Sequence, residues 1–330
     1  MFGADGVAPV RASTHSGPVK RQSLIIDCDP GVDDAIGLLL AFASPELDLK
    51  AIMTVGGNVP VARTSRNARI IRQIAGREDV PVFAGAGVPL RREPAGAGEF
   101  HGAEGLGWLE VFEPDAPLAD GHEADALTRI VMDEPEGSVA LALMGPMTNL
   151  ALAMKAEPRL AARLGPVVAM GGARTEGGNI TPSAEFNIWA DPDAAAEVFA
   201  SGCEMIVMGL DATHQVRATE DRIAALEASG DARAATAARL LRFSQAIERD
   251  IVGWDAAPLH DPCTVAWLLR PELFRLAPCR IAVETESELT RGHTAVEFRV
   301  DGATARHHWA TGADGQGVFD LLAARLGGGE

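Results

Sequence analysis

The sequence predicts an α/β fold in which helices cover both faces of an open, mostly parallel sheet. Short apolar runs rich in β-branched residues alternate with segments of helical pattern. Runs that are apolar along their whole length are typical of strands buried on both faces, as in parallel sheets. The expected strands occupy residues 23–28, 49–55, 80–83, 138–144, 166–170 and 204–210. The helical segments between them include 61–76, 123–135 and 190–202.

The pattern changes after residue 211. We expect helices at about 219–228, 232–252 and 261–269, then a small hairpin from CRIAVET and HTAVEFRV, and a closing helix at GVFDLLAARL. No linker rich in Gly, Ser or Pro interrupts the chain, so we expect residues 23–330 to form a single domain after a flexible leader at 1–22. The glycine-rich segment 85–107 is longer than an ordinary connection, which predicts a mobile lid.

Composition excludes several classes of function. The 46 acidic residues outnumber the 29 Lys and Arg residues, giving a net charge of −17, and no basic block is present that could follow a nucleic acid backbone. No apolar run approaches the roughly 18 residues of a membrane span, and residues 1–22 lack the apolar core of a secretory signal. The four cysteines are widely spaced and are typical of buried thiols. We therefore expect a cytoplasmic protein that binds neither nucleic acid nor membranes.

The stretch DCDPGVDDA at 27–35 places four aspartates at the end of the first expected strand. Asp27 and Asp29 point to the same face of that strand because side chains alternate with period two. Asp33 and Asp34 fall in the first turn of the next helix, where an acid caps the helix and favours its positive end. Capping needs one acid, whereas four like charges repel one another unless a cation lies among them. Dense oxygen ligands suit Ca²⁺ or Mg²⁺, so the spacing predicts a metal site.

Polar loops follow several of the other expected strands. Because open α/β sheets bind ligands at the carboxyl ends of their strands, these loops are candidates for the same site. They contain glycines and no lysine, which argues against a phosphate ligand. Their amides and carboxylates suit hydroxyl groups such as those of a sugar; these side chains are Asn58, Asn179, Glu185 and Asn187. Each asparagine alone is more typical of a turn, so the prediction depends on their convergence with the aspartates.

A His-Asp pair precedes the expected helix at 261–269. Asp261 followed by Pro262 is typical of an N-cap and the first residue of a helix. Adjacent His260 and Asp261 would equally provide a proton donor beside a metal ligand. The sequence leaves both interpretations open.

Six longer motifs are distributed along the chain. They are DCDPGVDDA at 27–35, VGGN at 55–58, GPMTN at 145–149, MGG at 170–172, NITPSAEFNIWADP at 179–192 and PLHDPCTVA at 258–266. Together they resemble the inosine-uridine preferring nucleoside hydrolases, from about residue 23 to the C-terminus. The resemblance implies a nucleoside hydrolase-like fold with a Rossmann-like core, assembled as a homodimer or homotetramer.

The resemblance also implies Ca²⁺-dependent hydrolysis of the N-glycosidic bond of ribonucleosides, which releases ribose and a free base. The implied Ca²⁺ ligands are Asp29, Asp34, the Met144 carbonyl and Asp261, with Asp29 also acting as general base on a metal-bound water. The implied ribose-binding residues are Asp33, Asn58, Asn179, Glu185 and Asn187, with Met170 lining the pocket. His260 would assist departure of the base as a proton donor, Asp27 would support the aspartate loop, and His101 would belong to a flap over the pocket.

One departure from the family concerns the base. Several family members place tyrosines on the helix before the His-Asp pair to contact the base, whereas this chain has no tyrosine. That helix offers Phe243, Ser244, Glu248 and Trp254 instead. The sequence therefore leaves open whether the preferred base is a purine or a pyrimidine, or whether the substrate is a ribosyl compound other than a common nucleoside.

Two alternatives remain at this point. A phosphatase of the haloacid dehalogenase type also begins with two alternating aspartates after a strand, but it needs a later lysine beside the phosphoryl group, and Lys155 falls within a helical segment. A Ca²⁺-assisted ribose- or nucleoside-binding protein without turnover would need neither a general base nor a proton donor.

Overall fold

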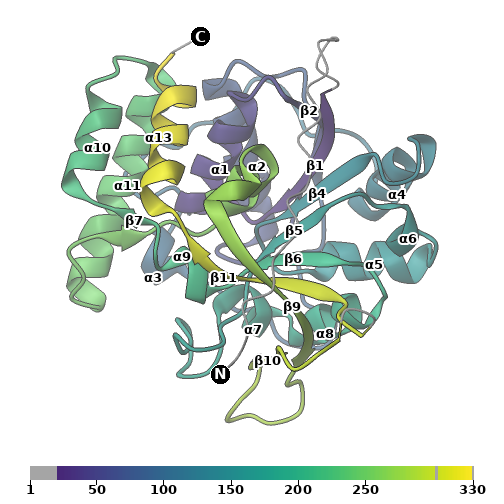
Figure 1. The fold of residues 1–330 in the computed structure, drawn as a ribbon. Coiled ribbons are helices and arrows are strands. Elements are labelled where there is room, and N and C mark those ends of the chain that lie inside the picture. The colour runs from purple at the N-terminus through teal and green to yellow at the C-terminus, as the bar shows by residue number, and fades with distance from the viewer. Residues whose placement is uncertain (1–20, 302–303, 329–330) are drawn as a thin grey trace.

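The fold is built on one large twisted sheet, as the apolar runs predict. The structure, a computed structural model, describes residues 21–301 and 304–328. Its nine-stranded sheet has the order β10-β9-β11-β6-β5-β4-β1-β2-β3, and all neighbouring pairs from β11 to β3 are parallel (Figure 1). The strands are β1 (Gln22–Cys28), β2 (Leu47–Thr54), β3 (Val82–Ala84), β4 (Val139–Leu143), β5 (Val167–Met170), β6 (Met205–Met208), β9 (Phe274–Val283), β10 (Thr294–Glu297) and β11 (His307–Ala313).

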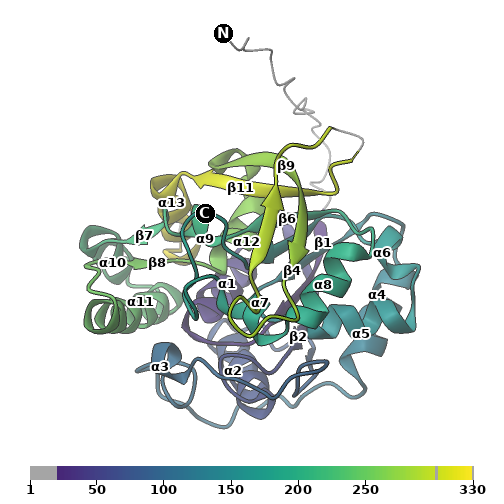
Figure 2. The same cartoon turned by 90° about the horizontal axis from the view of Figure 1, so that it is seen from below.

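Helices cover both faces of this sheet and create two apolar layers. In β1, Leu24 and Ile26 pack into one layer and Ile25 into the other, because adjacent side chains point to opposite faces. The first layer contains α1 (Val32–Phe42), α2 (Val61–Ile74), α10 (Glu220–Glu227), α11 (Ala232–Ile251), α12 (Pro262–Leu269) and α13 (Gly315–Leu326). The second contains α4 (Glu123–Asp133), α5 (Thr148–Ala156), α6 (Leu160–Arg163) and α8 (Pro192–Ala200). Figure 2 shows these two groups on opposite sides.

Short elements complete the fold. They are α3 (Gly98–His101), α7 (Phe186–Ala190), α9 (Leu210–Thr213), η1 (Pro271–Leu273), β7 (Arg217–Ala218) and β8 (Ala257–Pro258). The last two pair antiparallel as a separate two-stranded sheet. All four cysteines are free and buried, as expected from their spacing.

The C-terminal part differs from the sequence prediction in one respect. The predicted hairpin forms from β9 and β10, but it is continuous with the main sheet because β11 pairs antiparallel with β9 and parallel with β6. The sequence of β11, HHWATGA, is not an apolar run, so it gave no strand signal. The expected leader at 1–22 lies almost wholly outside the described residues, and Gln22 already belongs to β1.

No helix in the described part of the chain is long and apolar enough to cross a membrane.

Candidate active site

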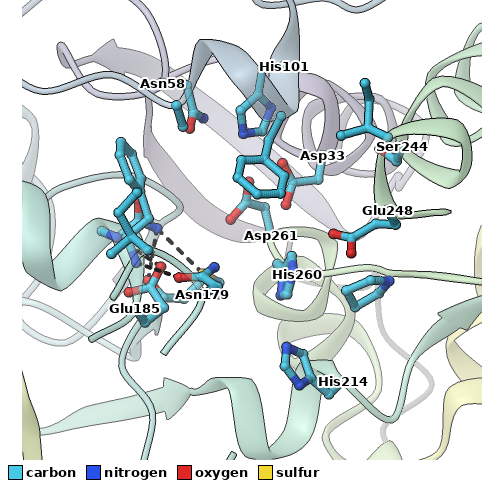
Figure 3. A pocket seen from close by; sticks show the side chains of 18 of the residues that line it. Asp33, Asn58, His101, Asn179, Glu185, His214, Ser244, Glu248, His260 and Asp261 are labelled. Atoms are coloured by element: carbon cyan, nitrogen blue, oxygen red, sulfur yellow. Dashed lines mark hydrogen bonds between the residues drawn. The ribbon is translucent and has the colours of Figure 1, made fainter. Parts of the chain in front are cut away.

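A pocket of about 340 Å³ opens where the loops at the carboxyl ends of the parallel strands meet α11 and the start of α12. Ten of the sequence-predicted residues line it: Asp33, Asn58, His101, Met144, Met170, Asn179, Glu185, Asn187, His260 and Asp261. In Figure 3, Asp33 and Asp261 lie at the centre, with Asn179 and Glu185 on one side and Ser244 and Glu248 of α11 on the other. No Lys or Arg side chain lines this pocket in the parts of the chain that the structure describes.

The loop between β1 and α1 is held by the carboxylate of Asp34. Its Oδ2 accepts hydrogen bonds from the Gly31 N–H at 2.9 Å and from Asn58 Nδ2 at 3.1 Å, and its Oδ1 accepts from the Asp29 N–H at 3.1 Å. Asp34 is fully buried and Asp33, its neighbour, faces the pocket. The capping interpretation therefore holds for Asp34 and accounts for only one of the four acids.

Asp29 lies in a space that only glycine neighbours permit. A Cβ on Gly57 would lie 2.0 Å from Asp29 Oδ2, and one on Gly145 would lie 2.6 Å from Oδ1. Oδ2 accepts a hydrogen bond from the Asn58 N–H at 2.7 Å, whereas Oδ1 is buried with no partner among the described residues. An unpartnered buried carboxylate oxygen is costly, so this atom calls for a ligand or a proton.

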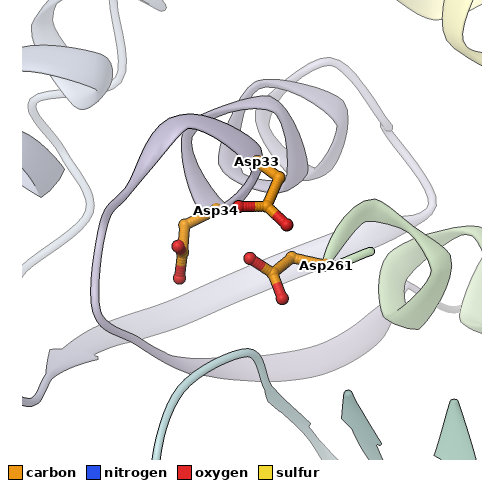
Figure 4. Close-up of side chains that lie close together, drawn as sticks. All are labelled: Asp33, Asp34 and Asp261. Atoms are coloured by element: carbon orange, nitrogen blue, oxygen red, sulfur yellow. The ribbon is translucent and has the colours of Figure 1, made fainter. Parts of the chain in front are cut away.

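Three other carboxylates converge beside it. Asp33, Asp34 and Asp261 each offer one oxygen, and these oxygens lie within 4.8 Å of one another (Figure 4). Burial raises the pKa of Asp34 to about 7, and burial followed by repulsion from neighbouring aspartates raises the pKa of Asp29 and Asp261 well above the usual range. These hard oxygen donors, with no cationic side chain in the pocket, fit a divalent cation such as Ca²⁺.

Asp261 occupies the N-cap position before α12, but its side chain makes no capping hydrogen bond with the described residues. Its backbone angles are already helical (φ −59°, ψ −39°), so of the two interpretations the structure tests only the capping one, and its hydrogen bond is absent from the described residues. Its carboxylate points instead toward Asp33 and Asp34. Asp27, by contrast, lies behind the cluster, where it accepts a hydrogen bond from Asn149 Nδ2 at 2.8 Å.

The predicted hydroxyl-binding side chains Asn179, Glu185 and Asn187 lie at or near the start of α7. The Glu185 carboxylate accepts hydrogen bonds from three backbone N–H groups, those of Gly172, Asn187 and Ile188. Asn187 Nδ2 donates to the Met144 carbonyl at 2.9 Å, which places that carbonyl at the pocket. Asn179 lies at the exposed rim, where its Oδ1 accepts from the Phe186 N–H at 2.9 Å.

Two predicted histidines complete the site. His101, on α3 within segment 85–107, accepts a hydrogen bond at Nδ1 from the Val32 N–H at 3.0 Å, so this segment reaches the first turn of α1. His260 lies 2.8 Å from Thr213 through Nδ1 and Oγ1. Burial lowers the pKa of His260 to about 4 and the pKa of His101 below its usual value, so both imidazoles are neutral at pH 7.

Sequence reasoning missed several pocket residues. His214 and Glu176 line the pocket and pair at 3.0 Å through Nδ1 and Oε2, and the His214 ring contacts Trp254 edge-on with centroids 5.2 Å apart. His214 follows a four-residue helix, and Glu176 lies in an irregular loop, so neither carries a periodic signal. The one hint in the sequence was Trp254, on the segment that replaces the expected tyrosines.

Comparison with known proteins agrees with this geometry. Residues 24–320 match the family described as inosine-uridine preferring nucleoside hydrolase. The pyrimidine-specific ribonucleoside hydrolase RihA of Photobacterium profundum is 41% identical over 307 residues, which cover 92% of this chain and 98% of that protein.

Solved structures are similar over the same range. A plant nucleoside hydrolase, PpNRh1, superposes with a TM-score of 0.88 at 33% identity and covers 93% of this chain and 99% of its own. A purine-preferring ribonucleoside hydrolase from Gardnerella vaginalis gives a TM-score of 0.87 at 29% identity, with 93% and 98% covered. The family match excludes the haloacid dehalogenase alternative. The chain belongs to the inosine-uridine preferring nucleoside hydrolase family and is a nucleoside hydrolase.

Proposed function

We propose that this protein hydrolyses the N-glycosidic bond of ribonucleosides in a Ca²⁺-dependent reaction that releases ribose and a free base. The observation that carries the proposal is the group of three close carboxylates, Asp33, Asp34 and Asp261, of which Asp33 and Asp261 line the pocket. No Lys or Arg among the described residues lines this pocket to neutralise them. Hard oxygen donors at this density suit a divalent cation, and the matched family is one of nucleoside hydrolases.

The residues that would hold Ca²⁺ are Asp29, Asp34, Asp261 and the Met144 carbonyl. Asp33 also has an oxygen close to those of Asp34 and Asp261, and it faces the pocket, so it would contact the ribose beside the ion. When bound, the cation would lower the pKa of a water molecule and offset the charge of the aspartates. The unpartnered Oδ1 of Asp29 supports its assignment as a ligand.

Asp29 would act as the general base that takes a proton from the attacking water. Its Oδ2 is fixed by the Asn58 N–H, so the carboxylate cannot rotate freely. Asp33, with Asn58, Asn179, Glu185 and Asn187, would hold the ribose hydroxyls and position the anomeric carbon. The surrounding carboxylates would stabilise the oxocarbenium character that develops as the bond breaks.

His260 would assist departure of the base. Its imidazole is neutral at pH 7. We therefore assign it the role of a hydrogen-bond donor to the leaving base rather than that of an imidazolium that transfers a proton. His101 would lie on the flap opposite, with its proton on Nε2 because Nδ1 accepts from Val32.

We propose pyrimidine ribonucleosides as the preferred substrates. The support is the 41% identity to a pyrimidine-specific relative, against 29% to a purine-preferring one with a similar fold. Family membership further supports a homodimer or homotetramer, which sedimentation analysis would test.

A nucleoside panel tests the function. Ribose release from uridine, cytidine, inosine and guanosine would be measured as reducing sugar, with Ca²⁺ present. Turnover of uridine and cytidine faster than of the two purine nucleosides is expected. Tight binding of all four without ribose release would instead identify a nucleoside-binding protein.

A further inference from the structure

Thr213 makes an unusual contact for a threonine at the end of a helix. It is fully buried, and its Oγ1 lies 2.8 Å from His260 Nδ1. A threonine hydroxyl in a helix commonly bonds to a backbone carbonyl of the preceding turn. Here no such bond is present, and His260 is the hydroxyl's one partner among the described residues.

The backbone holds both residues in place independently of this contact. Strand β7 follows Thr213 and strand β8 precedes His260, and Arg217 pairs with Pro258 across them. The Leu259 N–H also donates to the Val216 carbonyl at 2.8 Å. The two side chains are therefore brought together by a small antiparallel sheet, and the loss of one hydroxyl leaves that frame intact.

The number of protons available to the contact between Thr213 Oγ1 and His260 Nδ1 decides which tautomer His260 adopts. A hydroxyl has one proton, and in the described residues the only acceptor within reach of Thr213 Oγ1 is Nδ1 of His260. If Nδ1 carried the proton, the Thr213 proton would be buried without an acceptor, which is costly. The satisfied arrangement has Thr213 donating to Nδ1, so the ring proton is on Nε2, for which no protein partner is found among the same residues.

We propose that Thr213 is a positioning residue that fixes His260 in the Nε2–H tautomer, so that Nε2 donates to the leaving base. The inference rests on the proposed function, because it assigns Thr213 a part in the departure of the base. The bond between the base and C1′ breaks, its electron pair goes to the base nitrogen, and Nε2–H donates a hydrogen bond to the departing base.

Two variants and two substrates test the proposal. Thr213→Val keeps the shape of the side chain and removes the hydroxyl, whereas Thr213→Ser keeps the hydroxyl. The substrates are the nucleoside that the parent cleaves fastest and 4-nitrophenyl β-ribofuranoside, whose leaving group departs as a stable anion without help. We expect Thr213→Val to lower kcat on the nucleoside about tenfold and to change KM and turnover of the nitrophenyl riboside by less than about twofold.

Thr213→Ser is expected to restore most of the nucleoside activity. Equal losses on both substrates would show a merely structural role and overturn the proposal, as would an unchanged kcat on the nucleoside.

A spectroscopic readout keeps the test independent of activity. Nitrogen-15 NMR of histidine-labelled parent protein should show His260 as the Nε2–H tautomer, and Thr213→Val should introduce the Nδ1–H form. A parent spectrum with the proton on Nδ1 would overturn the proposal even if Thr213→Val did not fold. Absence of ribose release by the parent would contradict the proposed function instead, while the NMR result would still decide the tautomer.

Discussion

The four aspartates in and around the β1–α1 loop have the same side chain, but they lie in four different environments. Asp27 is bonded to Asn149, Asp29 to the Asn58 backbone, and Asp34 to three donors, while Asp33 faces the pocket. Strand alternation and helix capping predict the direction of each carboxylate from the sequence. These environments depend on Asn58 and Asn149, which reach the loop from the ends of other strands. The local sequence pattern of the loop does not reveal these contacts.

At Asp29 we predict a loss of turnover without a loss of fold. Asp29→Asn removes the proposed general base and one proposed anionic ligand, so kcat for ribose release should fall at least about 100-fold. Ribose release and thermal unfolding would be measured together. Asp133→Asn, which changes an exposed acid on α4, is the matched control and should behave as the parent. An Asp29→Asn variant with more than about a tenth of the parent kcat would contradict this assignment.

The pocket residues that the sequence did not reveal were missed for one physical reason. Thr213, His214 and Glu176 act through contacts between segments that are remote in the chain, such as the 47-residue separation of Thr213 from His260. Neither a four-residue helix nor an irregular loop carries the periodicity from which such contacts could be inferred.

At the scale of elements, segment 85–107 is tethered along its length in this structure. The Ala86 N–H donates to Asn149, the Leu90 N–H to Asp191, and the Ala97 N–H to the Asn58 carbonyl. The sequence predicts a mobile lid, and that expectation of mobility stays a prediction. Of the three partners, Asn58 also lines the pocket, so the segment is bonded to one residue of the site.

Asp191 joins three elements and should be costly to remove. It accepts from the Ala194 N–H at the start of α8, from Thr148 Oγ1 on α5, and from Leu90 in the segment. Asp191→Ala leaves these donors without a partner, so we expect a loss of about 3 kcal/mol in the free energy of unfolding. Urea unfolding would measure it.

Asp314→Ala provides the control, because Asp314 is an exposed N-cap of α13 whose carboxylate, among the described residues, accepts hydrogen bonds only from Gln316 and Gly317 of that helix. Its expected cost is about 1 kcal/mol. Equal costs for the two variants would show that the bonds from Asp191 to α5 and to segment 85–107 contribute nothing.

The elements themselves were predictable where the periodicity was strong. The six predicted strands, β1 to β6, are largely buried apolar runs and appear close to the predicted bounds. Strand β11 could not be predicted because its stability comes from pairing with β6 and β9 rather than from an apolar run.

At the scale of the whole molecule, we expect the buried acids to make stability depend on pH and on the proposed Ca²⁺. Burial raises the pKa of Asp34 and Glu185 to about 7, compared with about 4 in an unfolded chain. Between these values the metal-free folded state binds more protons than the unfolded state, so this contribution to stability is lost as pH rises through about 7.

The buried histidines act in the opposite direction at lower pH. The pKa of His260 falls to about 4 and those of His101 and His214 also fall, so their unfolded states bind more protons below about pH 6.5. Above pH 6.5 the unfolded imidazoles progressively lose their protons, so the histidine effect fades and the acids dominate. We expect the melting temperature of metal-free protein to fall from pH 6.5 to 8, and to fall less with Ca²⁺ present, because the ion binds the ionised carboxylates. A melting temperature that rises across this window without metal would contradict the assignment.

The central claim is that the aspartate cluster holds a Ca²⁺ ion that the reaction requires. The most direct test is ribose release from uridine by the full chain as purified, after exhaustive chelation, and after Ca²⁺ is added back, with metal content determined by mass spectrometry. We expect chelation to lower the rate at least about 100-fold and Ca²⁺ to restore it. Full activity in protein shown to contain no metal would contradict it.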